Sequence, residues 1–232
     1  MVFHREIRAG DGDVTRLAAT RRIVSGIVFF LATQTALAAE PGNPPDWCRN
    51  GAFATDQNNL RLVRVLRRTG LLMDSGQKKG CPQAGAACAL GGSHADTSDE
   101  LLVNSELPGF FCAYRPANGD GGWVAKSDVA VEPQQPTAQP PLAAWAGQWR
   151  DDDDRIRITQ RGKALTFAGE ASWADQNSGS FAGMATPKGA AVRVTDDACT
   201  VTLRLLGAYL VVDDNAECGG MNVRFTGVYR RR

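Results

Sequence analysis

The chain has 232 residues, 43% of them hydrophobic and 22% charged, which is enough apolar material for one or two packed cores. Its 26 Lys and Arg residues nearly balance its 25 Asp and Glu residues, so the formal net charge is only +1. Because the charges are so nearly balanced, the chain as a whole has no electrostatic attraction to nucleic acid or anionic lipid. We therefore predict no nucleic-acid partner.

Residues 1–38 have the pattern of a secretory signal peptide. Two arginines at 21–22 precede the apolar run 23–31, and Ala36-Leu37-Ala38 supplies the small residues that a signal peptidase requires. An uncleaved membrane anchor is the alternative, but the apolar run is short and is followed by polar residues at 33–35. We therefore expect a periplasmic or secreted protein whose mature chain has no membrane span.

All six cysteines follow this segment: Cys48, Cys81, Cys88, Cys112, Cys199 and Cys218. An even number in an exported chain predicts disulfides rather than reactive thiols. Cys199 and Cys218 are expected to pair, because only these two follow a proline-rich segment. The first four allow three pairings, of which we favour Cys81–Cys88 and Cys48–Cys112. Zinc is the alternative, but the chain has no C-x2-C pair and His94 is the only histidine after residue 38.

Residues 39–131 are predicted to form a β-domain that follows an N-terminal arm. Residues 60–68 fit a strand, although a short basic helix is the competing interpretation because apolar residues also recur every three positions. Residues 80–99 are rich in Gly, Ala and Ser and predict a long loop. Three more strands are expected after it, at 101–103, 109–114 and 122–125. A Gly-rich hairpin turn precedes the last of them.

The second half of this region resembles bacterial SH3-like domains, through Gly109, Phe110, Phe111, Gly122, Trp123, Val124 and Ser127-Asp128-Val129. The resemblance covers about residues 60–131 and departs from the pattern in the cysteine-containing loop 81–98. It implies a small five-stranded barrel in the cell envelope that binds cell-wall peptides or a protein. Phe110, Tyr114 and Trp123 are its candidate ligand-binding residues, although at least half of the aromatic residues of so small a barrel belong to its core.

Residues 132–141 contain four prolines and predict a semi-rigid linker, because each proline fixes its own φ and lacks an N–H. Residues 142–232 alternate apolar and polar side chains in short segments, as at 200–205 and 222–225. This pattern predicts an antiparallel β-barrel, a meander of seven or eight strands. The predicted fold class is therefore all-β, with an SH3-like small barrel and a second barrel, each folded around its own core.

Two further resemblances concern the C-terminal domain. Gly147-Gln148-Trp149 is similar to the Gly-x-Trp that opens lipocalin-type barrels, which implies a carrier with an empty interior. Residues 210–229 are similar to the end of some lysozyme-inhibitor-like exported proteins. An inhibitor would need an exposed loop that enters an active site, which we place around residues 213–222, with Asn222 as a candidate contact residue.

Recognisable catalytic patterns are missing from the sequence. A Cys–His or Ser–His–Asp site would have to use His94, and Ser93 beside it lies outside any G-x-S-x-G elbow. The acidic run 151–154 lacks the alternating spacing and distal Glu of a calcium loop, and is interpreted as a solvated turn. We predict a monomeric, non-catalytic protein without cofactor or metal that binds a cell-wall peptide or an envelope protein. Inhibition of a lysozyme or protease through the C-terminal domain is the alternative.

Overall fold

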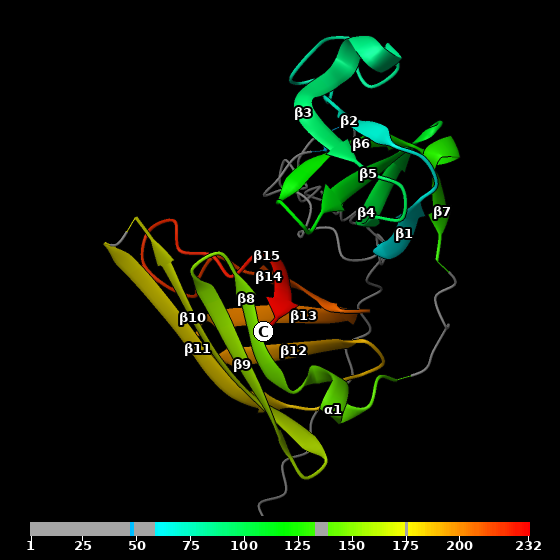
Figure 1. Ribbon diagram of the computed structural model, residues 1–232. Helices are drawn as coiled ribbons and strands as arrows, with labels where there is room; N and C mark the ends of the chain where they lie inside the picture. The colour runs from blue at the N-terminus through cyan, green and yellow to red at the C-terminus, as the bar shows by residue number, and fades with distance from the viewer. Residues whose placement is uncertain (1–46, 49–58, 133–138, 175) are drawn as a thin grey trace, which may run out of the picture. The chain divides into compact units, whose positions relative to one another are not determined.

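The computed structural model describes residues 47–48, 59–132, 139–174 and 176–232 (Figure 1). The predicted signal peptide, most of the N-terminal arm and residues 133–138 of the predicted linker lie outside these ranges. Within them, no helix has the length and hydrophobicity that crossing a bilayer requires. The fold is all-β, as predicted, and consists of two antiparallel sheets.

The first sheet has seven strands in the order β3-β2-β6-β5-β4-β1-β7. Two short 3-10 helices accompany them, at Gly85–Cys88 and Lys126–Asp128. Its strands are β1 (Arg61–Val65), β2 (Thr69–Leu72), β3 (Ala89–Ala95), β4 (Glu100–Leu107), β5 (Phe110–Arg115), β6 (Asp120–Ala125) and β7 (Val129–Val131).

Two local predictions for this sheet can be compared with the structure. The strand predicted at 60–68 is confirmed as β1 and the helix is wrong, because Val63 and Val65 are buried while Arg64 between them is exposed. The long loop predicted at 80–99 is partly wrong, because β3 lies within it and pairs with β2. Most side chains of β3 are at least partly exposed, so the strand leaves no apolar alternation in the sequence.

All three predicted disulfides are present: Cys48–Cys112, Cys81–Cys88 and Cys199–Cys218. The first ties the segment before β1 to β5, and the second closes the turn that leads into β3. No free cysteine occurs among the described residues. Disulfides of this number are typical of proteins that fold in an oxidising compartment.

The second sheet has eight strands in the order β11-β10-β9-β8-β15-β14-β13-β12, preceded by the single-turn helix α1 (Leu142–Trp145). Its strands are β8 (Gly147–Asp151), β9 (Asp154–Arg161), β10 (Ala164–Trp173), β11 (Asn177–Ala185), β12 (Ala191–Asp196), β13 (Cys199–Leu206), β14 (Tyr209–Asp214) and β15 (Gly227–Arg231). The strand predicted around 222–225 is absent, since those residues belong to the loop before β15, although Val223 and Phe225 are buried.

The two edge strands of this sheet, β11 and β12, approach each other without a hydrogen-bonded ladder. The backbone N–H of Ala182 on β11 donates to the carboxylate of Asp196 on β12 at 2.8 Å. Gly183 lies so close to Val194 that an added Cβ would stand 2.7 Å from its Cγ1. The second sheet is therefore a nearly closed barrel, with its edges joined by side chains.

Side chains fill the interior of this barrel. The largest of them are buried to less than 2% exposure: Trp145, Trp149, Phe167, Phe225, and Tyr229. Phe181, also buried, meets Phe225 edge to face, with ring centroids 4.8 Å apart. Because the aromatic rings occupy the space that a carried ligand would need, the interior is a core and does not support a lipocalin-type carrier.

One hydrophobic cluster contains residues of both sheets. It includes Cys112 and Trp123 from the first sheet together with Val211 and Val228 from the outer side of β14 and β15. The hydroxyl of Tyr209 on β14 also donates to Glu100 on β4, at 3.3 Å. Val211 and Val228 therefore pack outside the barrel core, while the folding of each domain around its own core stays a prediction.

Candidate functional site

The three aromatic residues predicted to bind a ligand in the first sheet do not form an exposed groove. Trp123 is 0% exposed, because β6 lies between β2 and β5 and its inner face is covered. Phe110 and Tyr114 are partly buried against the same cluster. Burial raises the pKa of the Tyr114 hydroxyl to about 12. The side chain of Trp123 therefore belongs to the core in this structure, and ligand binding by these aromatic residues stays a prediction.

Asn222, the fourth predicted contact residue, is exposed and lies between β14 and β15. We call residues 215–226 the rim loop. Its residues Ala216 and Asn222 have φ of +64° and +65°, so the backbone turns sharply at both positions. The rim loop overlaps the segment 213–222 in which the sequence placed an inhibitory loop.

A buried carboxylate at the end of β14 organises the rim loop. The side chain of Asp214 is 0% exposed and accepts hydrogen bonds from the backbone N–H of Phe225, of Thr226 at 3.1 Å and of Ala216 at 2.6 Å. Arg224 pairs with the same carboxylate at 2.8 Å. Backbone groups that a loop normally leaves to water therefore bond inside the protein, which restrains both ends of the rim loop.

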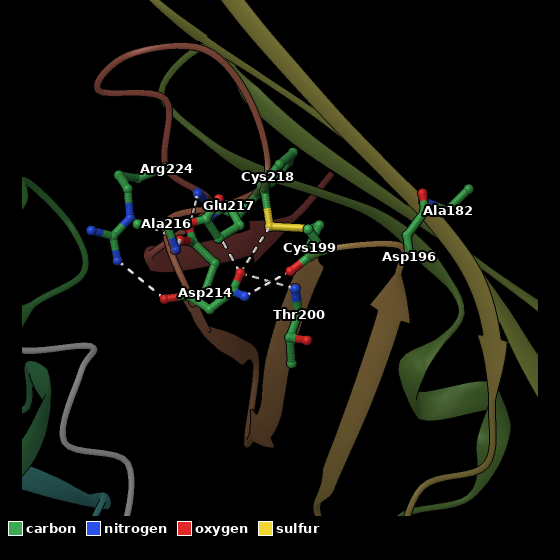
Figure 2. The surroundings of a disulfide bond; sticks show 12 residues. Ala182, Asp196, Cys199, Thr200, Asp214, Ala216, Glu217, Cys218 and Arg224 are labelled. Atoms are coloured by element: carbon green, nitrogen blue, oxygen red, sulfur yellow. Dashed lines mark hydrogen bonds and ion pairs between the residues drawn. A yellow bond between two sulfur atoms is a disulfide. The ribbon is translucent and has the colours of Figure 1, made fainter.

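The next residue and a disulfide fasten the loop to β13 (Figure 2). The side chain of Asn215 accepts from the N–H of Thr200 at 3.0 Å and donates to the carbonyl of Ala198 at 2.8 Å. Cys218 in the rim loop is bonded to Cys199 at the start of β13. The loop is consequently held by a covalent bond as well as by hydrogen bonds.

The rim loop also touches the hairpin between β10 and β11. Gly219 and Gly179 form a β-bridge, and the N–H of Gly220 donates to the carbonyl of Ser178 at 3.2 Å. A Cβ on Gly179 would lie 2.3 Å from the carbonyl oxygen of Cys218, so only glycine permits this approach. The contact places the rim loop at the end of the barrel where β10 and β11 project beyond the other strands.

Two large apolar side chains are exposed at this end. Met221 in the rim loop is 77% exposed, and Trp173 at the end of β10 is 53% exposed. Trp173 pairs with Asn177, and a Cβ on Gly220, the neighbour of Met221, would stand 3.2 Å from the Asn177 side chain. The fastened loop therefore displays Met221 and Asn222 to solvent beside a hairpin that displays Trp173.

Asp214 and Asn215 lie within the loop predicted around 213–222 but were not singled out, and Trp173 was not identified from the sequence as a site residue. The run Asp213-Asp214-Asn215 ahead of a cysteine was a usable signal, because Asp and Asn side chains commonly bond to nearby backbone N–H groups in turns. Trp173 carried no such signal. It continues the inward-facing series of β10 and is exposed only because the strand extends past the barrel end.

The acidic run 151–154 forms the tight turn between β8 and β9, with Asp152 at φ +47°. Asp151 accepts a hydrogen bond from the N–H of Val228 at 3.1 Å, and burial raises the pKa of its carboxyl to about 6. In the ranges that the structure describes, no group of three or more His, Cys, Asp or Glu residues is arranged to hold a metal ion. The run is a turn, as predicted, but Asp151 within it is partly buried and not fully solvated.

No family model matches the chain, and neither a curated protein nor a solved structure is significantly similar to it. The resemblances to SH3-like, lipocalin-type and lysozyme-inhibitor-like proteins therefore stay predictions. The rim loop is therefore a candidate site by its geometry alone.

Proposed function

We propose that the protein is an exported, non-catalytic inhibitor that binds an enzyme of the lysozyme or protease class through the rim loop and Trp173. The observation that carries this proposal is the exposure of Met221, at 77%, on a loop held by Cys199–Cys218 and by the buried carboxylate of Asp214. A restrained loop that exposes a large apolar side chain is what an inhibitor inserts into an active-site cleft.

Physical chemistry supports this use of a restrained loop. A loop that is already ordered before binding loses little conformational entropy in the complex, so more of its contact energy becomes affinity. Methionine adapts its shape to an apolar pocket, and tryptophan is enriched among the residues that dominate binding energy. Asn222 beside Met221 adds a polar group that can fix the orientation of the contact.

Export to the periplasm or the medium is part of the proposal. It is supported by the three disulfides and by the signal-like sequence of residues 1–38. Binding of cell-wall peptide or of an envelope protein through the first sheet is the competing function. It has less support, since Trp123 is in the core and Phe110 and Tyr114 are partly buried.

The test is to titrate the purified protein into activity assays of lysozymes and of serine proteases, with retention on purified sacculi measured in parallel. We expect saturable inhibition of at least one enzyme, which Met221→Asp weakens by about tenfold or more, since a buried hot-spot contact contributes about 1–2 kcal/mol or more. Met184→Asp is the matched control, because Met184 is 70% exposed on the outer side of β11, away from the rim loop.

Equal effects of the two methionine substitutions would contradict a role for the rim loop. Retention on sacculi at moderate salt without inhibition of any enzyme would favour the competing function. Because both methionines are exposed, neither substitution is expected to unfold the barrel.

A further inference from the structure

Three arginines occupy facing positions on adjacent strands of the second sheet. Arg155 on β9 faces Arg150 on β8, and Arg150 in turn faces Arg230 on β15. We call these three residues the arginine row. Their strand neighbours Trp149, Ile156 and Tyr229 are buried in the barrel core, so the row lies on the outer side of the barrel. The chain is almost neutral overall, which makes this local concentration of charge more notable.

Like charges in directly facing positions destabilise a sheet. Arg155 offsets this repulsion by an ion pair with Glu170 on β10. Within the described ranges, no ion pair of Arg150 or Arg230 occurs in the structure. The positive charge of Arg230 acts on the nearby Asp151 carboxylate, which offsets part of the repulsion, and an anion bound on the outer side would relieve the repulsion that remains at Arg150 and Arg230.

A surface hollow lies beside the row. It has a volume of about 380 Å³ and is lined by Arg150, Asp152, Arg230, Arg231 and Arg232. Arg231 is held in place, because its guanidinium lies 4.9 Å from the centroid of the Trp149 ring and donates to the carbonyl of Ala144. The volume is in the range of small-ligand sites, and four of the five lining residues are arginines.

We propose that this hollow binds the phosphoryl group of a small anionic ligand. A phosphoryl group presents several oxygens in a tetrahedral arrangement and can accept from guanidinium groups on more than one side. A carboxylate has two oxygens in one plane and is satisfied by a single guanidinium fork. Arg150 and Arg230 approach from adjacent strands and Arg232 follows the end of β15, while the guanidinium of Arg231 is already engaged by Trp149 and Ala144, so the tetrahedral group suits the hollow better.

A small ligand fits the geometry better than a membrane surface does. The hollow is a concave site on one side of a barrel, and Asp152 at its border would be brought against the negative surface of an anionic bilayer. The same carboxylate can accept a hydroxyl group of a small phosphorylated compound. Arg230 also lines a second hollow together with Asp99 and Glu100, so Arg150 is the better residue on which to test the site.

The experiment measures binding of inorganic phosphate and of glycerol 3-phosphate to the full-length protein by calorimetry at low ionic strength. Acetate is the carboxylate probe, and vesicles of phosphatidylglycerol and of phosphatidylcholine are the membrane probes. We expect saturable binding of both phosphates, weaker binding of acetate, and an affinity for phosphate about tenfold lower in Arg150→Gln. Arg193→Gln on the outer side of β12 is the matched control and should bind as the unmodified protein does.

The Tm of the same variants is a second measurement, because a general folding defect would lower Tm and the loss of repulsion should raise it. Removal of one charge from the row relieves repulsion, so Arg150→Gln should raise Tm by about one or two degrees in the absence of ligand. Met221→Asp should leave phosphate binding unchanged, which separates this site from the rim loop. The proposal is overturned by absence of phosphate binding, by acetate binding of equal strength, by binding to anionic vesicles alone, or by equal loss in Arg193→Gln.

Discussion

Two loops of this protein are built on the same plan, and the difference between them lies in the side chains that they expose. The loop after β2 begins at Asp74, which is 0% exposed and accepts from the N–H of Cys48 at 3.2 Å and of Gln77 at 2.9 Å. The rim loop begins after Asp214, whose buried carboxylate accepts from backbone N–H groups at both ends of the loop. Each loop also contains a cysteine of a disulfide.

The loops differ in what they are fastened to and in what they display. Cys81–Cys88 closes a turn within the first loop, while Cys199–Cys218 joins the rim loop to β13. The exposed side chains of the first loop are polar or small, as at residues 76–80, whereas the rim loop exposes Met221. A buried aspartate and a disulfide therefore restrain both loops. Only the exposed side chain, Met221 in the rim loop, distinguishes the candidate binding loop from the structural one.

The comparison is tested most strongly at the two aspartates. Asp214→Ala should lower the free energy of unfolding by about 3–4 kcal/mol, because it leaves buried N–H groups and Arg224 without their acceptor. Asp74→Ala should cost less, about 2 kcal/mol, since the backbone N–H groups of Cys48 and Gln77 lose their side-chain acceptor there. Urea unfolding measures both values. Glu217→Ala, an exposed position in the rim loop, is the control and should change stability little.

A loss below about 1 kcal/mol in Asp214→Ala would show that water replaces the carboxylate, and the rim loop would then not be held as we describe.

Loss of a disulfide should give the next largest decrease in stability, after Asp214→Ala. Replacing Cys199 and Cys218 by alanine should lower stability by about 3 kcal/mol, because the bond spans 19 residues and its loss increases the entropy of the unfolded chain. Replacing Cys81 and Cys88, which are 7 residues apart, should lower it by about 2 kcal/mol. Thermal unfolding under non-reducing conditions gives the two values. The reverse order would show that the loops differ in native-state packing more than in chain entropy.

Asp151, at the end of β8, is a third aspartate that accepts from a backbone N–H, and here the effect of burial on its pKa outweighs that of hydrogen bonding. Its folded-state pKa is raised to about 6, first by burial, while the N–H of Val228 opposes the shift. The folded protein therefore holds a proton that the unfolded chain releases near pH 4, and stability falls as the pH rises from about 4 to about 6.

Asp151→Asn should remove this part of the pH dependence and raise stability above pH 6 by about 1–2 kcal/mol, a value reduced for solvent screening of the partly exposed group. Unfolding measured between pH 4 and 8 tests this expectation. A variant that keeps the full decline between pH 4 and 6 would show that another group causes it.

The smallest expected effect concerns the exposed methionines. Met221→Asp and Met184→Asp should each change stability by less than about 0.5 kcal/mol, because both side chains are mostly in solvent. Measuring the stability of each variant together with its inhibition shows whether Met221 contacts the target enzyme or helps to hold the rim loop in place. A large loss of stability in Met221→Asp alone would place Met221 among the residues that hold the loop together.

Part of the architecture was predictable because it depends on local pattern. In β13 the buried side chains alternate without exception, as the sequence of Val201, Leu203 and Leu205 indicates. Alternation with a period of two involves only neighbouring residues, so it can be recognised in the sequence without knowing the partner strand. Cys199–Cys218 was predictable because only these two cysteines follow the proline-rich segment, whereas Cys81–Cys88 with Cys48–Cys112 was the favoured one of three pairings. β3 was missed because a strand with exposed, small side chains has no such pattern.

The sequence by itself determined an all-β chain with three cystines and indicated a loop near Asn222. Only the tertiary structure decided that Trp123 is core, that the barrel interior is filled, and that three arginines form one row. These features depend on strand order and register, which bring residues such as Arg150 and Arg230 together across 80 positions of the chain. Hydrophobic patterning shows which face of a strand is buried, but the partner strand and its register are set by packing of the whole barrel.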